Sequence, residues 1–120
     1  MSGTMTLVQV LSSAGKQSAN ILTSIDKLFL FSWSELGWDT NAVPYRDEID
    51  AGAERKTFAI FTDNASRIKK TFNGEGSASN WWLRSPVAAS STSFGIVITS
   101  GGSGNNGASV AYGVAFGFCI

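Results

Sequence analysis

Few side chains in this 120-residue sequence are suited to catalysis or to metal binding. The sequence has no histidine, so it lacks the residue that most often serves as general base or metal ligand, and its serines have no histidine to activate them. Asp47, Glu48 and Asp50 provide carboxylates for a paired-carboxylate hydrolase, although three acids in one loop more often form a solvated face. Cys119 is the single cysteine and lies in an apolar stretch, where thiols are usually inert. We therefore expect a protein that is not an enzyme and that has no cofactor and no metal.

The charges are balanced in number but unevenly placed. Lys and Arg number 9 and Asp and Glu number 9, so the net charge is zero and gives no electrostatic reason to expect nucleic acid or an anionic membrane as partner. All charged residues lie between Lys16 and Arg84, and the segment 85–120 has none. The first residues have no basic stretch typical of a signal peptide, and no apolar run is long enough to span a bilayer. We expect a soluble chain without membrane insertion.

The uncharged segment 87–112 is the best candidate for a binding surface. Of the 25 residues 88–112, 13 are Ser, Gly or Asn, and Tyr112 ends the segment. Small adaptable hydrogen-bonding residues with an occasional aromatic anchor are typical of binding loops. The alternative is that exposed hairpins accumulate these residues for turn geometry alone. The candidate ligand-binding residues are Ser90, Ser91, Ser93, Ser103, Asn105, Asn106 and Tyr112.

Mainly strands are needed to position such a segment. Ser32 or Ser34 is expected to cap a short helix that begins near Glu35 and ends at Gly37. A helix is favoured over a strand for 53–61, and turns are expected at 63–66 and 73–76. Apolar patterning predicts strands at 5–11, 27–31, 67–72, 81–83 and 94–99, a weaker strand at 108–111 and an apolar strand at 113–120, with loops at 12–20 and 40–52. These elements predict an α+β fold with a mainly antiparallel sheet, in one domain over 1–120.

Within that domain, residues 1–86 are expected to be framework, 87–112 display hairpins, and 113–120 a closing core strand. Trp81 and Trp82 are adjacent and must face opposite sides of a strand, so one is expected in the core. The other is more often packed than free to stack on a sugar. Arg84 is the last charge before the neutral segment, and we expect it to pair with Asp26, Glu35 or Asp63 rather than with a ligand.

One string in the sequence is specific enough to indicate a family. The residues Trp81-Trp82-Leu83-Arg84-Ser85-Pro86, the Ser/Asn/Gly-rich hairpins that follow and the closing GVAFGFCI of 113–120 resemble the C-terminal half of the family of domain of unknown function 6273. That family is found in gut Firmicutes and their phages. Matches at 26–30, at 34–35 and at 61–68 extend the resemblance to about residues 20–120.

The resemblance implies a C-type-lectin-like fold. Several relatives resemble the variable proteins of diversity-generating retroelements, in which a C-terminal segment is varied on a fixed scaffold. Lectin-like domains that bind sugar through calcium have Glu-Pro-Asn or Gln-Pro-Asp together with Trp-Asn-Asp, and this sequence has none of these strings. The resemblance thus implies a non-catalytic display domain that binds a cell-surface protein or a glycan receptor.

The implied location is a phage virion or a bacterial cell surface, and a homo-oligomer is expected by analogy. The alternative is a structural virion component, such as a fibre, tail or capsid-decoration subunit, whose uncharged C-terminal segment packs in an assembly, because interface cores are depleted of charge.

Overall fold

The computed structural model describes residues 3–8, 21–26, 28–38, 57–71, 74–87 and 90–118. These residues form mostly strands, with two one-turn helical segments, η2 (Ser34–Leu36) and α2 (Asn64–Arg67). None of the described helices has the length and apolar character needed to cross a membrane. The strands are β1 (Gly3–Val8), β2 (Ile21–Asp26), β3 (Leu28–Leu30), β4 (Lys69–Lys70), β5 (Ala78–Ser79), β6 (Trp81–Pro86), β7 (Ser93–Val97), β8 (Ser103–Gly107), β9 (Gly113–Val114) and β10 (Phe116–Phe118).

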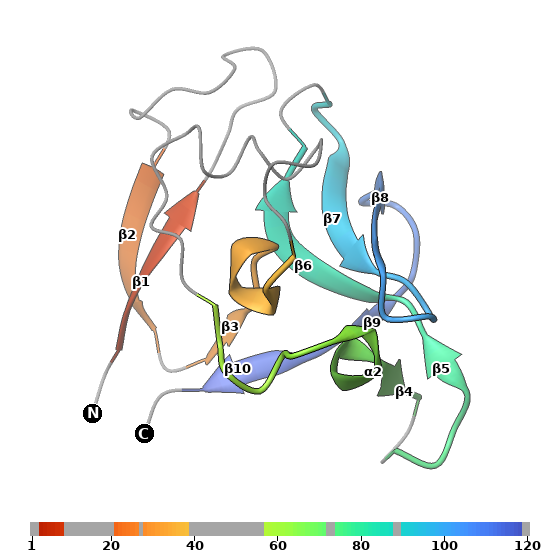
Figure 1. Cartoon of the computed structure of the whole chain (residues 1–120). Helices are drawn as coiled ribbons and strands as arrows, with labels where there is room; N and C mark the ends of the chain where they lie inside the picture. Colours follow the sequence, from red (N-terminus) through yellow and green to blue (C-terminus); the bar gives the residue numbers. More distant parts are fainter. Residues whose placement is uncertain are drawn as a thin grey trace.

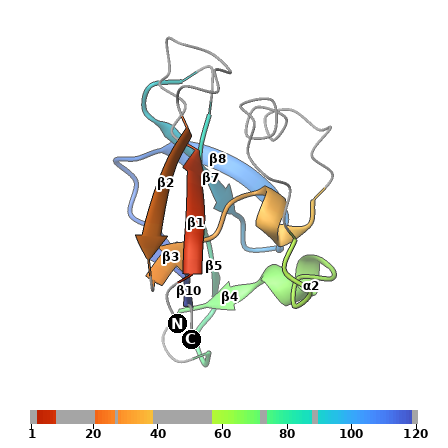
Figure 2. The ribbon, with the colours of Figure 1, turned by 90° about the vertical axis from the view of Figure 1, so that its left-hand side faces the viewer.

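The largest sheet has four strands in the order β8-β7-β6-β9. β6 pairs antiparallel with β7 on one side and parallel with β9 on the other, and β7 pairs antiparallel with β8. Three two-stranded antiparallel ribbons, β1–β2, β3–β10 and β4–β5, complete the strand pairing. Figure 1 shows the β1–β2 ribbon on the opposite side of η2 from β7 and β8, and Figure 2 shows this ribbon in front of them. The prediction of mainly antiparallel strands with few helices is confirmed.

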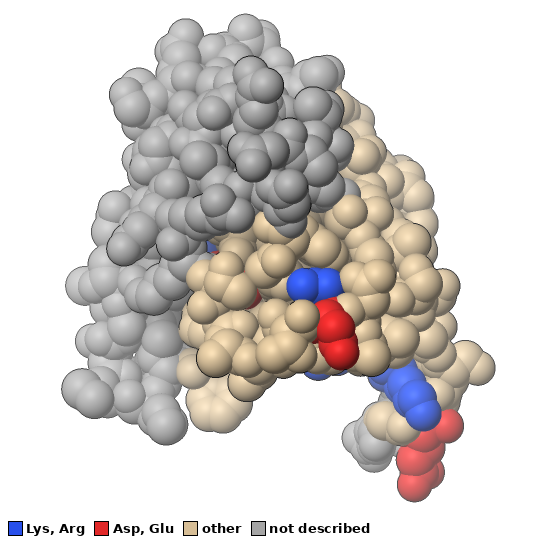
Figure 3. Space-filling model, viewed as in Figure 1, with Lys and Arg blue, Asp and Glu red and all other residues tan. Residues whose placement is uncertain are grey.

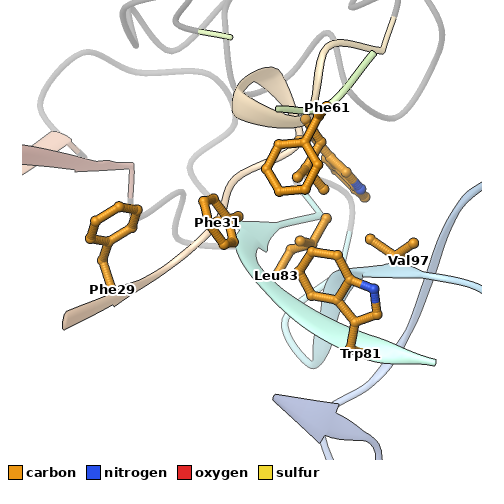
Figure 4. Packing of buried hydrophobic residues seen from close by; sticks show 8 residues of the cluster. Phe29, Phe31, Phe61, Trp81, Leu83 and Val97 are labelled. Carbon is orange, nitrogen blue, oxygen red and sulfur yellow. The ribbon is translucent and has the colours of Figure 1, made fainter. Parts of the chain in front are cut away.

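The hydrophobic core lies between η2 and one face of the four-stranded sheet (Figure 4). Phe31 is its centre: its ring makes edge-to-face contacts with Phe29, Phe58, Phe61 and Trp81 at centroid distances of 5.1–6.2 Å. Such aromatic pairs stabilise by geometry as well as by burial. The remaining buried members of the cluster are Trp33, Leu36, Leu83 and Val97.

The short helix at Glu35 forms where the sequence predicts it. The Glu35 amide donates to Ser32 Oγ at 3.4 Å and the Ser32 amide donates to Glu35 Oε2 at 2.9 Å, a reciprocal pair that resembles a capping box and lies one residue before the N-cap, Trp33. Gly37 ends the segment with φ +75°, a left-handed conformation that favours glycine. Neither candidate stands at the N-cap position, which is Trp33: Ser32 lies one residue before it and accepts from the Glu35 amide, while Ser34 is the first helical residue.

Three expectations for the middle of the chain need correction. Residues 57–61, the described part of the helix expected at 53–61, form a turn and no helix. The Thr57 hydroxyl and the Phe58 amide donate to backbone carbonyl oxygens of η2, and not to carbonyls within a helix of their own. The turn expected at 63–66 is the start of α2, where Asp63 and Ser66 form a capping box. The strand expected at 67–72 is limited to β4, and the hairpin turn that follows contains Gly74 at φ +80°.

The C-terminal part also differs from the sequence expectation. The weak strand expected at 108–111 is a turn, and the strand lies just before it, as β8. Residues 113–118 form two short strands, β9 and β10, in different sheets, and the large side chains of Val114, Phe116 and Phe118 are exposed rather than buried. A single core strand over 113–120 is therefore wrong for its described residues. The strand expected at 94–99 is present as β7, which ends at Val97, so residues 98–99 are not part of it. The loops expected at 12–20 and 40–52 lie outside the described residues.

Candidate functional site

β6 separates the core from the surface that carries the candidate site. Trp81 is 1% exposed and its indole Nε1 donates to the Arg67 carbonyl oxygen at 3.0 Å, so it is the core tryptophan of the pair. Trp82 is partly buried and points to the opposite face of the sheet, as strand alternation requires. We call this face, which carries Trp82, the outer face.

An ion pair holds β6 against the preceding segment. Arg84 donates from both terminal guanidinium nitrogens to Glu35, at 2.6 and 2.7 Å, and also donates to the Leu30 carbonyl oxygen. Glu35 is 4% exposed. The Trp33 amide donates to Ser85 Oγ at 3.0 Å, next to this pair. The expectation that Arg84 has a fixed framework partner is confirmed, and among the three acids considered the partner is Glu35.

Two of the predicted contact residues meet on the outer face. Strand register places Trp82 opposite Ile96 of β7, and Asn106 lies on the same face of the neighbouring β8. Asn106 Nδ2 donates to the Tyr112 hydroxyl at 2.8 Å, and the Tyr112 ring lies 5.2 Å from the Trp82 ring at 48°. The bond fixes the Tyr112 hydroxyl, and the ring contact fixes its aromatic face. Asn106, Tyr112 and Trp82 therefore form one polar and aromatic cluster.

The next two predicted residues lie on the free edge of β8. Ser103 and Asn105 are opposite Val97 and Gly95, on the other face from Asn106, and Asn105 is exposed. The Ile98 amide donates to the Gly102 carbonyl oxygen, so this pair at the end of the β7–β8 ladder is a hydrogen-bonded one, and every second pair along the ladder is hydrogen-bonded as well. Because ladder bonds alternate along an antiparallel pair, the N–H and C=O groups of Ser103 and Asn105 point away from β7. Within the described residues β8 pairs with β7 only, so this edge is open for hydrogen bonding.

The three serines near 90 form a separate group. Ser90 Oγ and Ser93 Oγ lie 2.9 Å apart, and Ser91 is exposed. Ser93 is opposite Gly107, whereas Ser103 is at the other end of the same ladder. The two ends are four residue positions apart along the strand, a distance of roughly 13 Å. The seven predicted residues therefore occupy three places around β7 and β8 and do not converge on one atom of a ligand.

An apolar groove on the outer face adjoins the cluster. It has a volume of about 410 Å³ and is open to solvent. Its charged lining residue, Arg84, has its guanidinium bound to Glu35, so it brings no unpaired charge. Sequence reasoning did not select the groove, although Phe94 and Val114 were part of expected strands. We call it the apolar groove; its lining residues are Leu30, Trp82, Leu83, Arg84, Phe94, Ala108 and Val114.

The surroundings are chemically neutral. Figure 3, which views the molecule from the η2 side, shows described Lys, Arg, Asp and Glu atoms near the middle and at the lower right, and none on the tan surface at the upper right. The lining of the groove on the opposite face has one charged residue, Arg84. Over the described part of the chain, no three His, Cys, Asp or Glu side chains gather as metal ligands would. Burial lowers the pKa of the Arg67 guanidinium, while Asp63 nearby raises it, and this residue lies by the core and not by the groove. The face suits apolar contact and uncharged hydrogen bonding.

A family model matches almost the whole chain. The family is described as "Domain of unknown function (DUF6273)", and its model covers residues 4–120. The chain belongs to the DUF6273 family. The match extends closer to the N-terminus than the resemblance seen in the sequence, so β1 is part of the family's domain. No curated protein and no solved structure matches the chain.

Proposed function

We propose that this DUF6273 domain is a non-catalytic binding domain that presents its uncharged C-terminal segment to a ligand or receptor. The observation that carries the proposal is the position of β8. It is the outermost strand of the sheet, it has no charged residue, and its Asn105 side chain and outward backbone groups are available to a partner. Next to it, the bond between Asn106 and Tyr112 holds a polar group and an aromatic ring at fixed positions.

The framework supports this role because it is rigid where the segment is attached. β7 is hydrogen-bonded to β6, and β6 is held by the Arg84–Glu35 pair and by the aromatic core. A binding surface placed on a fixed strand loses less conformational entropy on binding than one on a free loop. The finer parts of the proposal rest on the family resemblance. They are a C-type-lectin-like fold, a retroelement that varies the segment, a location on a phage virion or bacterial surface, and a cell-surface protein or glycan as receptor.

The test uses the full chain, multimerised on a fluorescent scaffold, as a probe of gut bacterial cells and of immobilised neutral glycans. Asn105→Arg places a long cation on the proposed surface, and Thr62→Arg places the same group at another exposed polar position. We expect binding by the wild type and by Thr62→Arg, and at least about tenfold weaker binding by Asn105→Arg. Equal binding by all three proteins, or by none, would contradict the proposal.

The second candidate is a structural component of an assembly. The observation that favours it is the exposure of Val114, Phe116 and Phe118, which is high for the large apolar side chains of a monomer. Amide hydrogen exchange separates the two candidates. Fast exchange of the outward amides of β8 in the free and assembled protein supports display, whereas protection of these amides only in an assembly supports the structural role.

A further inference from the structure

The segment 113–118 has its large and small residues on the unexpected sides. Ala115 packs against the core and Gly117 is buried, whereas Val114 is 52%, Phe116 59% and Phe118 69% exposed. In an amphipathic strand the large apolar residues normally face the core. Here the small ones do, and three large ones face solvent.

The packing beneath the segment explains why the register cannot be reversed. A Cβ atom added at Gly117 would lie 2.3 Å from the ring of Phe29, so the Phe29 ring already fills the space under β10. A shift by one residue would put Phe116 or Phe118 into that space, where neither ring fits. The outward direction of the two phenylalanines is therefore fixed by the core and is not a free choice of the strand.

The partner strand extends the exposed surface. Phe116 is opposite Leu30 and Phe118 is opposite Leu28 in the β3–β10 ribbon, so all four lie on one face, and Leu28 is 63% exposed. Figure 1 shows β10 alongside β3 at the lower end of the molecule, with β9 leading into it. We call this surface the apolar row; its residues are Leu28, Leu30, Val114, Phe116 and Phe118.

The apolar row is large for a surface that meets only water. At roughly 150–200 Å² for each large side chain, the exposed fractions of Leu28, Val114, Phe116 and Phe118 amount to on the order of 400 Å² of apolar surface. Leu30 and Val114 also line the apolar groove, so the row and the groove are continuous. A standard interface takes about 800 Å² from each partner, and the row alone provides about half of that.

The chemistry of the row and groove indicates what covers them. Neither contains a charged residue other than Arg84, which is bound to Glu35. A surface without free charge gives no attraction to a charged partner. When a two-fold axis places two copies of this surface face to face, no like charges meet. Protruding rings of Phe116 and Phe118 lie beside an open groove, so the same surface offers both a projection and a recess. That combination is what an isologous contact requires.

We propose that a second copy of this chain covers the apolar row, in a two-fold dimer in which phenylalanines of β10 from each copy enter the apolar groove of the other. The dimer covers Trp82, which lines the groove, but leaves the free edge of β8, on the other edge of the sheet, available to ligands. Each dimer then presents two binding edges, and linked edges bind a repetitive surface more tightly than single ones.

The test is sedimentation velocity on the full chain over a range of concentrations, with far-UV circular dichroism to check folding. Phe118→Ser removes the most exposed ring, Phe118→Leu keeps an apolar side chain, and Ile60→Ser is a matched control at an equally exposed site, 69% in both cases, outside the row. We expect a dimer for the wild type, Phe118→Leu and Ile60→Ser, and a dissociation constant at least about 30-fold higher for Phe118→Ser.

Two results would overturn the dimer. One is a wild-type monomer up to about 100 µM, where a specific dimer should be populated; the row would then belong to another partner. The other is equal weakening by Phe118→Ser and Ile60→Ser, which would indicate non-specific association. Asn105→Arg is expected to dimerise like the wild type, so a failure of the ligand-binding proposal and a failure of the dimer are seen separately.

Discussion

Removing the charge of Arg84 should cost much of the stability of the domain. The Arg84 side chain is 13% exposed and that of Glu35 5%, so both charges are largely withdrawn from water. Arg84→Met leaves the Glu35 carboxylate buried with the Ser32 amide as its remaining described donor. Breaking a buried pair in this way costs about 3–5 kcal/mol, which is a large part of the roughly 5–15 kcal/mol that holds a domain folded.

A double-mutant cycle isolates the interaction between the two charges. Glu35→Gln combined with Arg84→Met leaves neither charge buried, so we expect the double variant to lose no more than Arg84→Met alone, with a coupling energy of about 2–3 kcal/mol. Urea unfolding followed by tryptophan fluorescence measures it, because Trp33 and Trp81 are buried. Lys70→Met, which removes an exposed cation, should stay within about 0.5 kcal/mol of the wild type.

The reasoning is refuted if the two single losses simply add in the double variant. If Arg84→Met does not fold, Arg84→Lys tests the pair through its hydrogen-bond geometry, with a smaller loss of stability. Lysine keeps the charge but not the two parallel bonds, and we expect a loss of about 1–2 kcal/mol.

Three further changes test how close contacts and caps hold the α2 region. Gly101 and Gly74 both have φ near +80°, but a Cβ at Gly101 would lie 1.8 Å from the Asn64 carbonyl oxygen, whereas a Cβ at Gly74 would meet no atom within 4 Å. In urea unfolding we expect Gly74→Ala to lower the free energy of unfolding by about 1 kcal/mol. Gly101→Ala should lower it by at least about 2 kcal/mol more, because of the added clash. Asp63→Ala removes the cap of α2 and should lower the unfolding free energy by about 1 kcal/mol, and no measurable loss would show that the cap is dispensable. Arg67→Lys should lose about 1–2 kcal/mol, because lysine cannot reproduce the fork that donates to Asn64 Oδ1 and a carbonyl. Burial lowers the pKa of the Arg67 guanidinium, and we expect it to lower the pKa of a lysine amine at this position too. The lysine variant should then gain stability as pH rises toward about 10, and a flat profile would contradict this.

Local signals in the sequence predicted the framework well. The serine three residues before Glu35 and the glycine two residues after it were enough to predict η2, because a cap and a left-handed terminus are local features. The pattern of 81–83 predicted β6, and the isolated position of Arg84 next to a neutral segment predicted a fixed ion pair. The features of η2 and β6 depend on neighbours in the chain, which the sequence displays directly. The Arg84–Glu35 pair joins residues 49 positions apart, and the sequence left its acid open among Asp26, Glu35 and Asp63.

The features that failed depend on distant packing. Gly95 and Gly117 are needed because the rings of Trp33 and Phe29 lie where a Cβ would be, and the sequence shows a glycine without showing the ring. The outward direction of Phe116 and Phe118 follows from the same contact, so apolar composition alone suggested a core strand that the structure does not have.

The candidate site was predicted in part. Asn106 and Tyr112 were selected and are joined, and Trp82, which was expected to be packed, lies against the Tyr112 ring. The groove went unnoticed because its lining comes from β3, β6, β7 and β9, and no linear pattern reports which strands become neighbours.

The terminal position of β8 has a consequence for engineering. An inner strand must satisfy two neighbours, whereas Ser103 and Asn105 direct their outward groups away from the single strand that β8 borders. A combinatorial library that randomises these two codons should therefore retain a high fraction of folded members. If Trp81 and Leu83 of β6 were randomised instead, most members of the library should fail to fold, because those side chains fill the core.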